Sequence, residues 1–128
     1  MSKNILIVDD VAFNRIYLAK QLRFYKGKAL MDVLEASTVK EAMNTIKDRS
    51  PDVVITDINL PDSTGFELFK HSKNITHNLP FLFITAFPVK NFAGDLENLG
   101  IRANSIFTKP LDIATIRNVV YYFLKIEV

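Results

Sequence analysis

Cysteine is absent from this 128-residue chain, and glycine occurs only four times. Without cysteine the chain has no disulfide, no thiolate metal ligand and no thiol nucleophile. Its apolar stretches are far shorter than the roughly 18 residues that cross a bilayer, and the N-terminal one is too short for a signal peptide. We therefore expect a soluble, cytoplasmic protein that does not contact the membrane.

No run of charge of one sign is present. Sixteen Lys and Arg are interspersed with fourteen Asp and Glu, for a net charge of +2. This pattern lacks the basic stripe that follows a phosphate backbone, so we expect no binding to nucleic acid. The length and the 48% hydrophobic content suit a single domain with its own core.

Short apolar runs of strand type alternate with segments of helical periodicity. Strands are predicted at residues 5–8, 30–36, 53–56, 81–84 and 106–108. Helices are predicted at residues 11–26, from 39 past 46, around 66–69, at 92–99 and from 113 to 123. Five repeats of a strand followed by a helix predict an α/β fold, with one parallel sheet and helices on both faces.

Several local signals define the ends and inner faces of these helices. Gly27 is expected to end the first helix, whose inner face is predicted to be Ala12, Ile16, Ala19 and Leu22. Caps are predicted at Thr38, Thr64 and Asp112. In the last helix the predicted inward residues are Ile116, Val120 and Phe123, which leaves at least one of Tyr121 and Tyr122 exposed. The strand at 30–36 contains Asp32 and Glu35, which favours a position at the sheet edge.

Reactive side chains follow four of the predicted strands. Asp9 and Asp10 come after the first, Asp57 after the third, Thr85 after the fourth and Lys109 after the fifth. The carboxyl ends of parallel strands share one edge of the sheet, where ligands bind in open α/β folds. We therefore expect these side chains to meet in one pocket.

The chemistry of this set suits a phosphoryl group. Three nearby carboxylates repel one another unless they share a cation, and oxygen ligands favour Mg²⁺. Zinc is disfavoured because the two histidines, His71 and His77, lie away from the pocket and are expected at the surface. Lysine and threonine can bind phosphoryl oxygens, and an aspartate carboxylate can serve as a phosphoryl acceptor.

Two alternative enzyme classes would carry residues that this chain lacks. A nucleotide- or flavin-binding enzyme would carry glycines after its first strand, whereas Asp9-Asp10-Val11 stands there. A phosphatase of the haloacid dehalogenase type would carry a second aspartate two residues after its nucleophile, where Asn59 stands after Asp57. Neither pattern is met.

The combination of Asp9-Asp10, Thr-Asp57-Ile-Asn-Leu-Pro-Asp-Ser-Thr-Gly, Thr85-Ala86 and Lys109-Pro110 resembles the receiver domain of bacterial two-component response regulators. The resemblance covers essentially the whole chain. It implies a flavodoxin-like (βα)5 fold with sheet order 2-1-3-4-5. It also implies one receiver domain over residues 1–128, with no output domain in this chain.

The resemblance assigns roles to the acidic residues. Asp57 would accept a phosphoryl group from a phosphohistidine on a histidine kinase or a histidine phosphotransfer protein. Mg²⁺ would be bound by Asp10 and Asp57, by Asp9 through water, and by the backbone carbonyl of Asn59. The domain would catalyse its own phosphorylation and turn over no separate substrate.

Lys109 would pair with the phosphoryl group, and Thr85 would move to hydrogen-bond it. This movement would carry the signal to the face made by the fourth helix, fifth strand and fifth helix, where an unidentified partner or a second copy could bind. The dipeptide Asn14-Arg15, a few residues after the acidic pair, resembles the sequence at this place in receivers attached to hybrid kinases. The alternative is a receiver-like interaction or dimerisation module that is not phosphorylated.

Two features depart from the family pattern. Ile106 stands three residues before Lys109, where the family usually has Tyr or Phe. Phe107 is adjacent, but neighbouring strand residues face opposite sides, so it cannot take this place unless a bulge shifts the register. The segment from Gly100 to Lys109 is also about two residues longer than usual, which would allow such a bulge.

Overall fold

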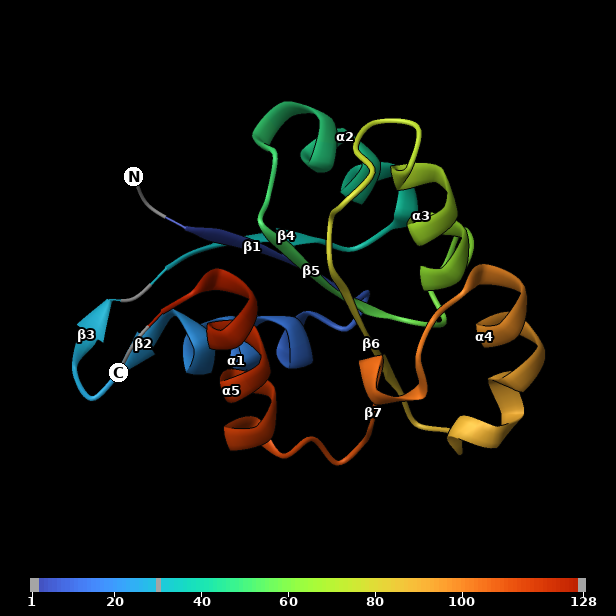
Figure 1. The fold of residues 1–128 in the computed structure, drawn as a ribbon. Coiled ribbons are helices and arrows are strands. Elements are labelled where there is room, and N and C mark those ends of the chain that lie inside the picture. The colour runs from blue at the N-terminus through green and yellow to red at the C-terminus, as the bar shows by residue number, and fades with distance from the viewer. Residues whose placement is uncertain (1–2, 30, 127–128) are drawn as a thin grey trace.

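A computed structural model describes residues 3–29 and 31–126. Its main sheet has five strands in the order β4-β1-β5-β6-β7, and every neighbouring pair is parallel (Figure 1). These strands are β1 (Asn4–Val8), β4 (Asp32–Ala36), β5 (Val53–Asp57), β6 (Phe81–Thr85) and β7 (Ile106–Thr108). Counted within this sheet, the order is 2-1-3-4-5, so the predicted flavodoxin-like fold and its edge strand are confirmed.

Helices cover both faces of this sheet. They are α1 (Ala12–Arg23), α2 (Val39–Arg49), α3 (Gly65–Ser72), α4 (Ala93–Leu99) and α5 (Ile113–Leu124), with short 3-10 turns η1 (Val89–Phe92) and η2 (Ala103–Ser105). One apolar cluster joins α1 and α5 to the sheet, and a second joins α2, α3 and α4 to the opposite face (Figure 1). Ile5 and Ile7 belong to the first cluster and Leu6 and Val8 to the second, so β1 is buried on both sides.

Within residues 3–29 and 31–126, no helix combines the length and the apolar character needed to cross a membrane.

A small hairpin follows α1 where the sequence predicted a longer helix. The helix ends at Arg23, and β2 (Phe24–Tyr25) pairs antiparallel with β3 (Lys28–Ala29). Lys26 and Gly27 between them have φ angles of 51° and 78°. Two successive positive φ angles are typical of the tight type I′ turn of hairpins. The predicted helix end at residue 26 is therefore wrong, and Gly27 forms the hairpin turn.

Packing against α5 explains why a hairpin forms after Arg23 in place of a longer α1. The Tyr25 ring lies edge-on to the Tyr121 ring at 6.3 Å, and the Arg117 guanidinium lies 4.7 Å from the centre of the Tyr25 ring. Arg117 also donates a hydrogen bond to the carbonyl O of Gln21 at 3.2 Å. These aromatic and cation–π contacts fix the hairpin beside α5.

The inner faces of α1 and α5 differ in part from the prediction. In α1 the buried residues are Leu18, Ala19 and Leu22, whereas Ile16 is 56% exposed and Ala12 is also exposed. In α5, Phe123 is 40% exposed while Tyr121 is buried. Tyr122 is 79% exposed, so one tyrosine is exposed as expected. Residue 30 of the predicted second strand lies outside the described residues.

The predicted helix caps are present. The Thr38 and Thr64 hydroxyls accept hydrogen bonds from the N–H groups of Glu41 and Glu67, both at 3.1 Å. Asp112 accepts from the N–H groups of Ala114 and Thr115. These contacts satisfy backbone donors that have no partner inside the helix.

Asp62 caps α2 from a distant part of the sequence. Its two carboxylate oxygens accept from the N–H groups of Val39 at 2.9 Å and Lys40 at 3.1 Å. These hydrogen bonds, led by that of Val39, hold the pKa of Asp62 below its ordinary value. The loop after β5 is thereby tied to the start of α2.

The longer segment before Lys109 is taken up without a bulge in the β6–β7 pairing. Phe83, Ile84 and Thr85 pair in regular order with residues 106, 107 and 108. The turn η2 directly precedes this strand. The bulge that the sequence would allow is therefore absent from this pairing.

The backbone of α3 passes very close to the end of β5. A Cβ atom on Gly65 would collide with the carbonyl O of Asp57, whereas a Cβ atom on Gly94 in α4 would meet no atom within 4 Å. We expect Gly65→Ala to lower the free energy of unfolding by about 1–3 kcal/mol through overpacking. The matched variant Gly94→Ala should instead stabilise the protein by about 0.4–1 kcal/mol. Urea denaturation measures both, and equal effects of the two variants would contradict the close approach.

Candidate functional site

All the predicted site residues meet at the carboxyl edge of the sheet. Asp57 ends β5 and Thr85 ends β6, while Asp9 and Asp10 follow β1 and Lys109 follows β7. The parallel register aligns these strand ends, because β1 pairs with β5, β5 with β6 and β6 with β7. The sequence argument for one shared edge is therefore met by the geometry.

Three carboxylates form the acidic part of the site. One oxygen each from Asp9, Asp10 and Asp57 lies within 4.8 Å of the others. Asp9 and Asp57 are buried, with 6% and 8% of their surface exposed, whereas Asp10 is exposed. Two buried carboxyl groups thus share a small space with a third that is exposed.

The pKa of Asp57 is strongly affected by its position in this cluster. Burial raises the pKa of Asp57 from its ordinary value of 3.8 to about 7, and hydrogen bonding and charge from Asp9 add to the rise. Lys109 opposes it, with its Nζ 3.5 Å from Oδ1 of Asp57. A second positive charge among the carboxylates would relieve the remaining repulsion.

The donor set fits Mg²⁺. Oδ1 of Asp57 is buried and, apart from its ion pair with Lys109, has no hydrogen-bond partner among the residues that the structure describes. Magnesium favours one or two carboxylates and keeps several waters, a demand that one exposed and two buried carboxylates can meet. Asn59 lines the same pocket of about 100 Å³, together with Ile84, Thr85, Ala86, Phe87 and Lys109.

Thr85 has a hydroxyl group with a free proton. Its Oγ accepts a hydrogen bond from the N–H of Phe87 at 3.0 Å. Across the described ranges this hydroxyl donates to no acceptor, although it carries one donor proton. The carbonyl O of Thr85 accepts from the N–H of Lys109 at 2.8 Å, so the two residues are held together.

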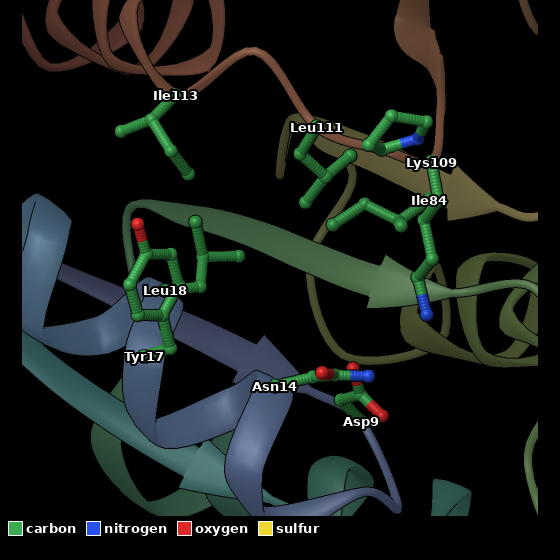
Figure 2. A pocket seen from close by; sticks show the side chains of 9 residues that line it. Asp9, Asn14, Tyr17, Leu18, Ile84, Lys109, Leu111 and Ile113 are labelled. Carbon is green, nitrogen blue, oxygen red and sulfur yellow. The ribbon is translucent and has the colours of Figure 1, made fainter.

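A second pocket of about 240 Å³ adjoins the site on the side of α1. Figure 2 shows the side chains of Asp9 and Lys109 pointing toward one another at one end of it. The remaining lining residues are Asn14, Tyr17, Leu18, Ile84, Pro110, Leu111 and Ile113. The sequence did not indicate this pocket, because its walls come from α1 and from the loop after β7.

The residues that depart from the family pattern lie on opposite faces of β7. Ile106 is buried in the cluster with Phe83 and Leu96, on the side of α4. Phe107 packs against the other cluster, on the side of α1 and α5. Phe107 therefore does not take the place of the usual aromatic residue.

The two histidines lie outside the site. Both are exposed, and Nε2 of His71 is 3.2 Å from a carboxylate oxygen of Glu67. Their expected position at the surface is confirmed.

The comparisons with known proteins agree on one family. Residues 5–121 match the family model described as response regulator receiver domain. Sporulation initiation phosphotransferase F of Bacillus subtilis (strain 168) is 30% identical over 127 residues, covering 99% of this chain and 98% of that protein. The phosphate regulon transcriptional regulatory protein PhoB of Pseudomonas aeruginosa is 33% identical over 112 residues, covering 86% of this chain and 46% of that protein.

Among solved structures, a response regulator receiver domain protein (CheY-like) from Methanospirillum hungatei JF-1 has the same fold. It matches with a TM-score of 0.83 over 98% of this chain and 95% of that chain, at 23% identity.

The raised pKa of Asp57 predicts a pH-dependent cost to stability. The folded protein keeps this proton up to about pH 7, whereas the unfolded chain loses it near 3.8. The folded state binds more protons in that window, so its stability falls as pH rises, by up to about 1.4 kcal/mol per pH unit. We expect Asp57→Asn, which cannot ionise, to become progressively more stable than the native chain from pH 4 to 7.

Urea denaturation of the metal-free proteins at several pH values measures this difference. Asp52→Asn serves as the control, because Asp52 is exposed and lies outside the cluster. A native-minus-variant difference that stays constant with pH would contradict the raised pKa.

Proposed function

The chain belongs to the response regulator receiver domain family, whose members are two-component phosphoacceptors, and we propose that Asp57 is the residue that accepts the phosphoryl group. The observation that supports this most is the joint placement of three carboxylates within 4.8 Å and of Lys109 Nζ at 3.5 Å from Asp57. Such a site can hold both a divalent cation and a phosphoryl group.

The proposed transfer begins with a carboxylate oxygen of Asp57 attacking the phosphorus of a phosphohistidine. A P–O bond forms and the P–N bond breaks, and the ring nitrogen keeps the electron pair. With its other nitrogen protonated, the donor ring leaves as neutral imidazole. The product is an acyl phosphate on Asp57, and the domain turns over no separate substrate.

The residues around Asp57 support this reaction by position and charge. Asp9, Asp10, Asp57 and the backbone carbonyl of Asn59 would hold Mg²⁺. When bound, Mg²⁺ supplies positive charge that offsets the negative charge of the phosphoryl oxygens. Lys109 provides a second positive charge, since its ammonium group already faces Asp57.

Thr85 is the proposed link from the site to the surface. Its free hydroxyl proton can be donated to a phosphoryl oxygen, because a hydroxyl can donate while its oxygen accepts from the Phe87 N–H. The signal would pass to the face formed by α4, β7 and α5, where an output partner or a second copy binds. Ile106 lies beneath this face and would replace the usual aromatic switch residue with an aliphatic one.

A histidine kinase or a histidine phosphotransfer protein is the proposed donor, acting in the cytoplasm. Apolar side chains beside the site offer such a protein a docking surface, since Phe13 is 78% exposed and Ile16 and Tyr17 are also exposed. Large exposed apolar groups of this kind are typical of protein interfaces. We propose that residues 1–128 act as one receiver domain in this exchange.

Incubation with acetyl phosphate and Mg²⁺ tests the proposed acceptor. We expect one phosphate adduct by intact-mass measurement, formed only in the presence of Mg²⁺, because the carboxylates need a cation to bind a further anion. Asp57→Asn should form no adduct, since an amide is not a nucleophile here. The control variant Asp52→Asn changes an exposed residue just before β5, and it should behave like the native chain.

The same experiment separates the proposal from the alternative of an unphosphorylated interaction module. A folded native chain that binds Mg²⁺ yet forms no adduct with acetyl phosphate, nor with phosphoramidate as a P–N donor, would favour that module. An adduct that persists in Asp57→Asn would move the acceptor to another residue.

A further inference from the structure

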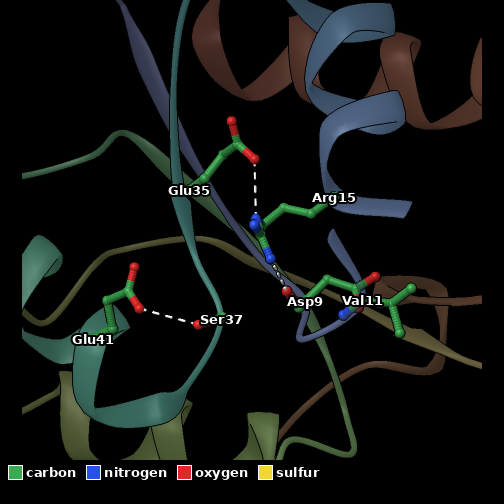
Figure 3. A network of polar contacts seen from close by, with 6 residues as sticks. All are labelled: Asp9, Val11, Arg15, Glu35, Ser37 and Glu41. Carbon is green, nitrogen blue, oxygen red and sulfur yellow. Dashed lines mark hydrogen bonds and ion pairs between the residues drawn. The ribbon is translucent and has the colours of Figure 1, made fainter. Parts of the chain in front are cut away.

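Arg15 connects the acidic edge of the sheet to two other elements. It lies in the first turns of α1, and its guanidinium group makes two different contacts (Figure 3). Nε donates to Oε1 of Glu35 on β4 at 3.0 Å, and Nη1 donates to the carbonyl O of Asp9 at 2.7 Å. The side chains of Arg15 and Glu35 are 18% and 32% exposed, so this pair is partly shielded from water.

Together with two other hydrogen bonds, the Arg15 contact holds Asp9 in place. The N–H of Asp9 donates to the carbonyl O of Ala36 at 3.0 Å. Its Oδ1 accepts from the N–H of Val11 at 2.9 Å, and its carbonyl O accepts from Arg15. Three of the four polar atoms of Asp9 are thus held by these hydrogen bonds, in which Oδ2 takes no part.

We propose that Arg15 is a positioning residue for the divalent cation, an inference that rests on the proposed function. A loop that is already held in place loses little conformational freedom when the cation binds, so the binding is tighter. Arg15 itself touches neither the cation nor the phosphoryl group. It acts through the main chain of Asp9, and Glu35 holds its guanidinium in the orientation needed for that contact.

Only arginine suits this role. The two contacts are made by two guanidinium nitrogens that lie rigidly in one plane. They reach acceptors on β4 and in the segment just after β1. A lysine ammonium is a single point donor on a flexible stem, so it can keep the charge but not both contacts. Charge and positioning can therefore be separated by substitution.

The test is a calorimetric titration of the full, metal-free chain with Mg²⁺. Loss of a group that orients a metal ligand typically weakens metal affinity by about 10–100-fold, and we expect this for Arg15→Ala. Arg15→Lys should remain several-fold weaker than the native chain despite its charge. Glu35→Gln keeps a neutral acceptor for Nε, and we expect its loss to be smaller than that of Arg15→Ala.

Controls separate positioning from a loss of fold. Arg102→Ala removes an exposed arginine at the start of η2, outside the acidic cluster and its pocket, and should bind Mg²⁺ like the native chain. Circular dichroism and thermal unfolding establish that each variant is folded at the titration temperature. With acetyl phosphate, the phosphorylation rate of Arg15→Ala should fall at low Mg²⁺ and recover most of its value at saturating Mg²⁺.

The outcomes distinguish this inference from the proposed function. A folded Arg15→Ala or Arg15→Lys chain with native Mg²⁺ affinity would overturn the positioning role and leave the proposed function intact. A rate that stays low at saturating Mg²⁺ would also overturn it, because Arg15 would then act on the chemistry itself. A native chain that takes up no Mg²⁺ would overturn the proposed function, and the inference with it.

Discussion

Parallel pairing of β1 with β5 in the middle of the sheet brings Asp9 beside Asp57, and the site depends on that pairing. The two strands are in register from Ile5 opposite Val53 to Val8 opposite Thr56, and both are buried on both faces. A shift of one residue would turn every side chain of a strand to the other face and mismatch both apolar clusters. The core therefore fixes where the carboxylates lie.

The same pairing places the carboxyl groups of Asp9 and Asp57 in buried positions, where the ionised form of Asp57 is disfavoured. Fully burying one aliphatic side chain contributes about 1.5–3 kcal/mol, and the central strands bury several each. This gain offsets the cost of burying Asp57 beside Asp9, which raises the pKa of Asp57 to about 7. Stability and the proposed function are in opposition at this edge, because the buried carboxylates that destabilise the folded protein are also the groups proposed to bind the cation.

The sequence predicts the sheet and the site well because both rest on short-range signals. Continuous apolar runs mark strands that are buried on both faces, and the residue that follows each run lies at the carboxyl edge. Caps such as Thr38 and Asp112 are equally local. The positions of Asp57, Thr85 and Lys109 could thus be inferred before their distances were known.

What the sequence did not predict depends on contacts between distant residues. Gly27 suits either the end of a helix or a hairpin turn, and the packing of Tyr25 on α5 decides between them. The exposure of Ile16 breaks the simple helical pattern, because α1 keeps apolar side chains on its outer surface next to the site. The link from Arg15 to Glu35 spans 20 residues and depends on the register of β1 with β4.

The hairpin gives this chain a built-in optical and magnetic reporter. With no tryptophan present, tyrosine dominates the near-ultraviolet absorption and emission, and Tyr25 and Tyr121 lie edge-on at 6.3 Å. Each ring shifts the proton resonances of the other through its ring current, with a steep dependence on distance and angle. A displacement of α5 relative to the end of α1 would therefore be recorded in the spectra of the unlabelled protein.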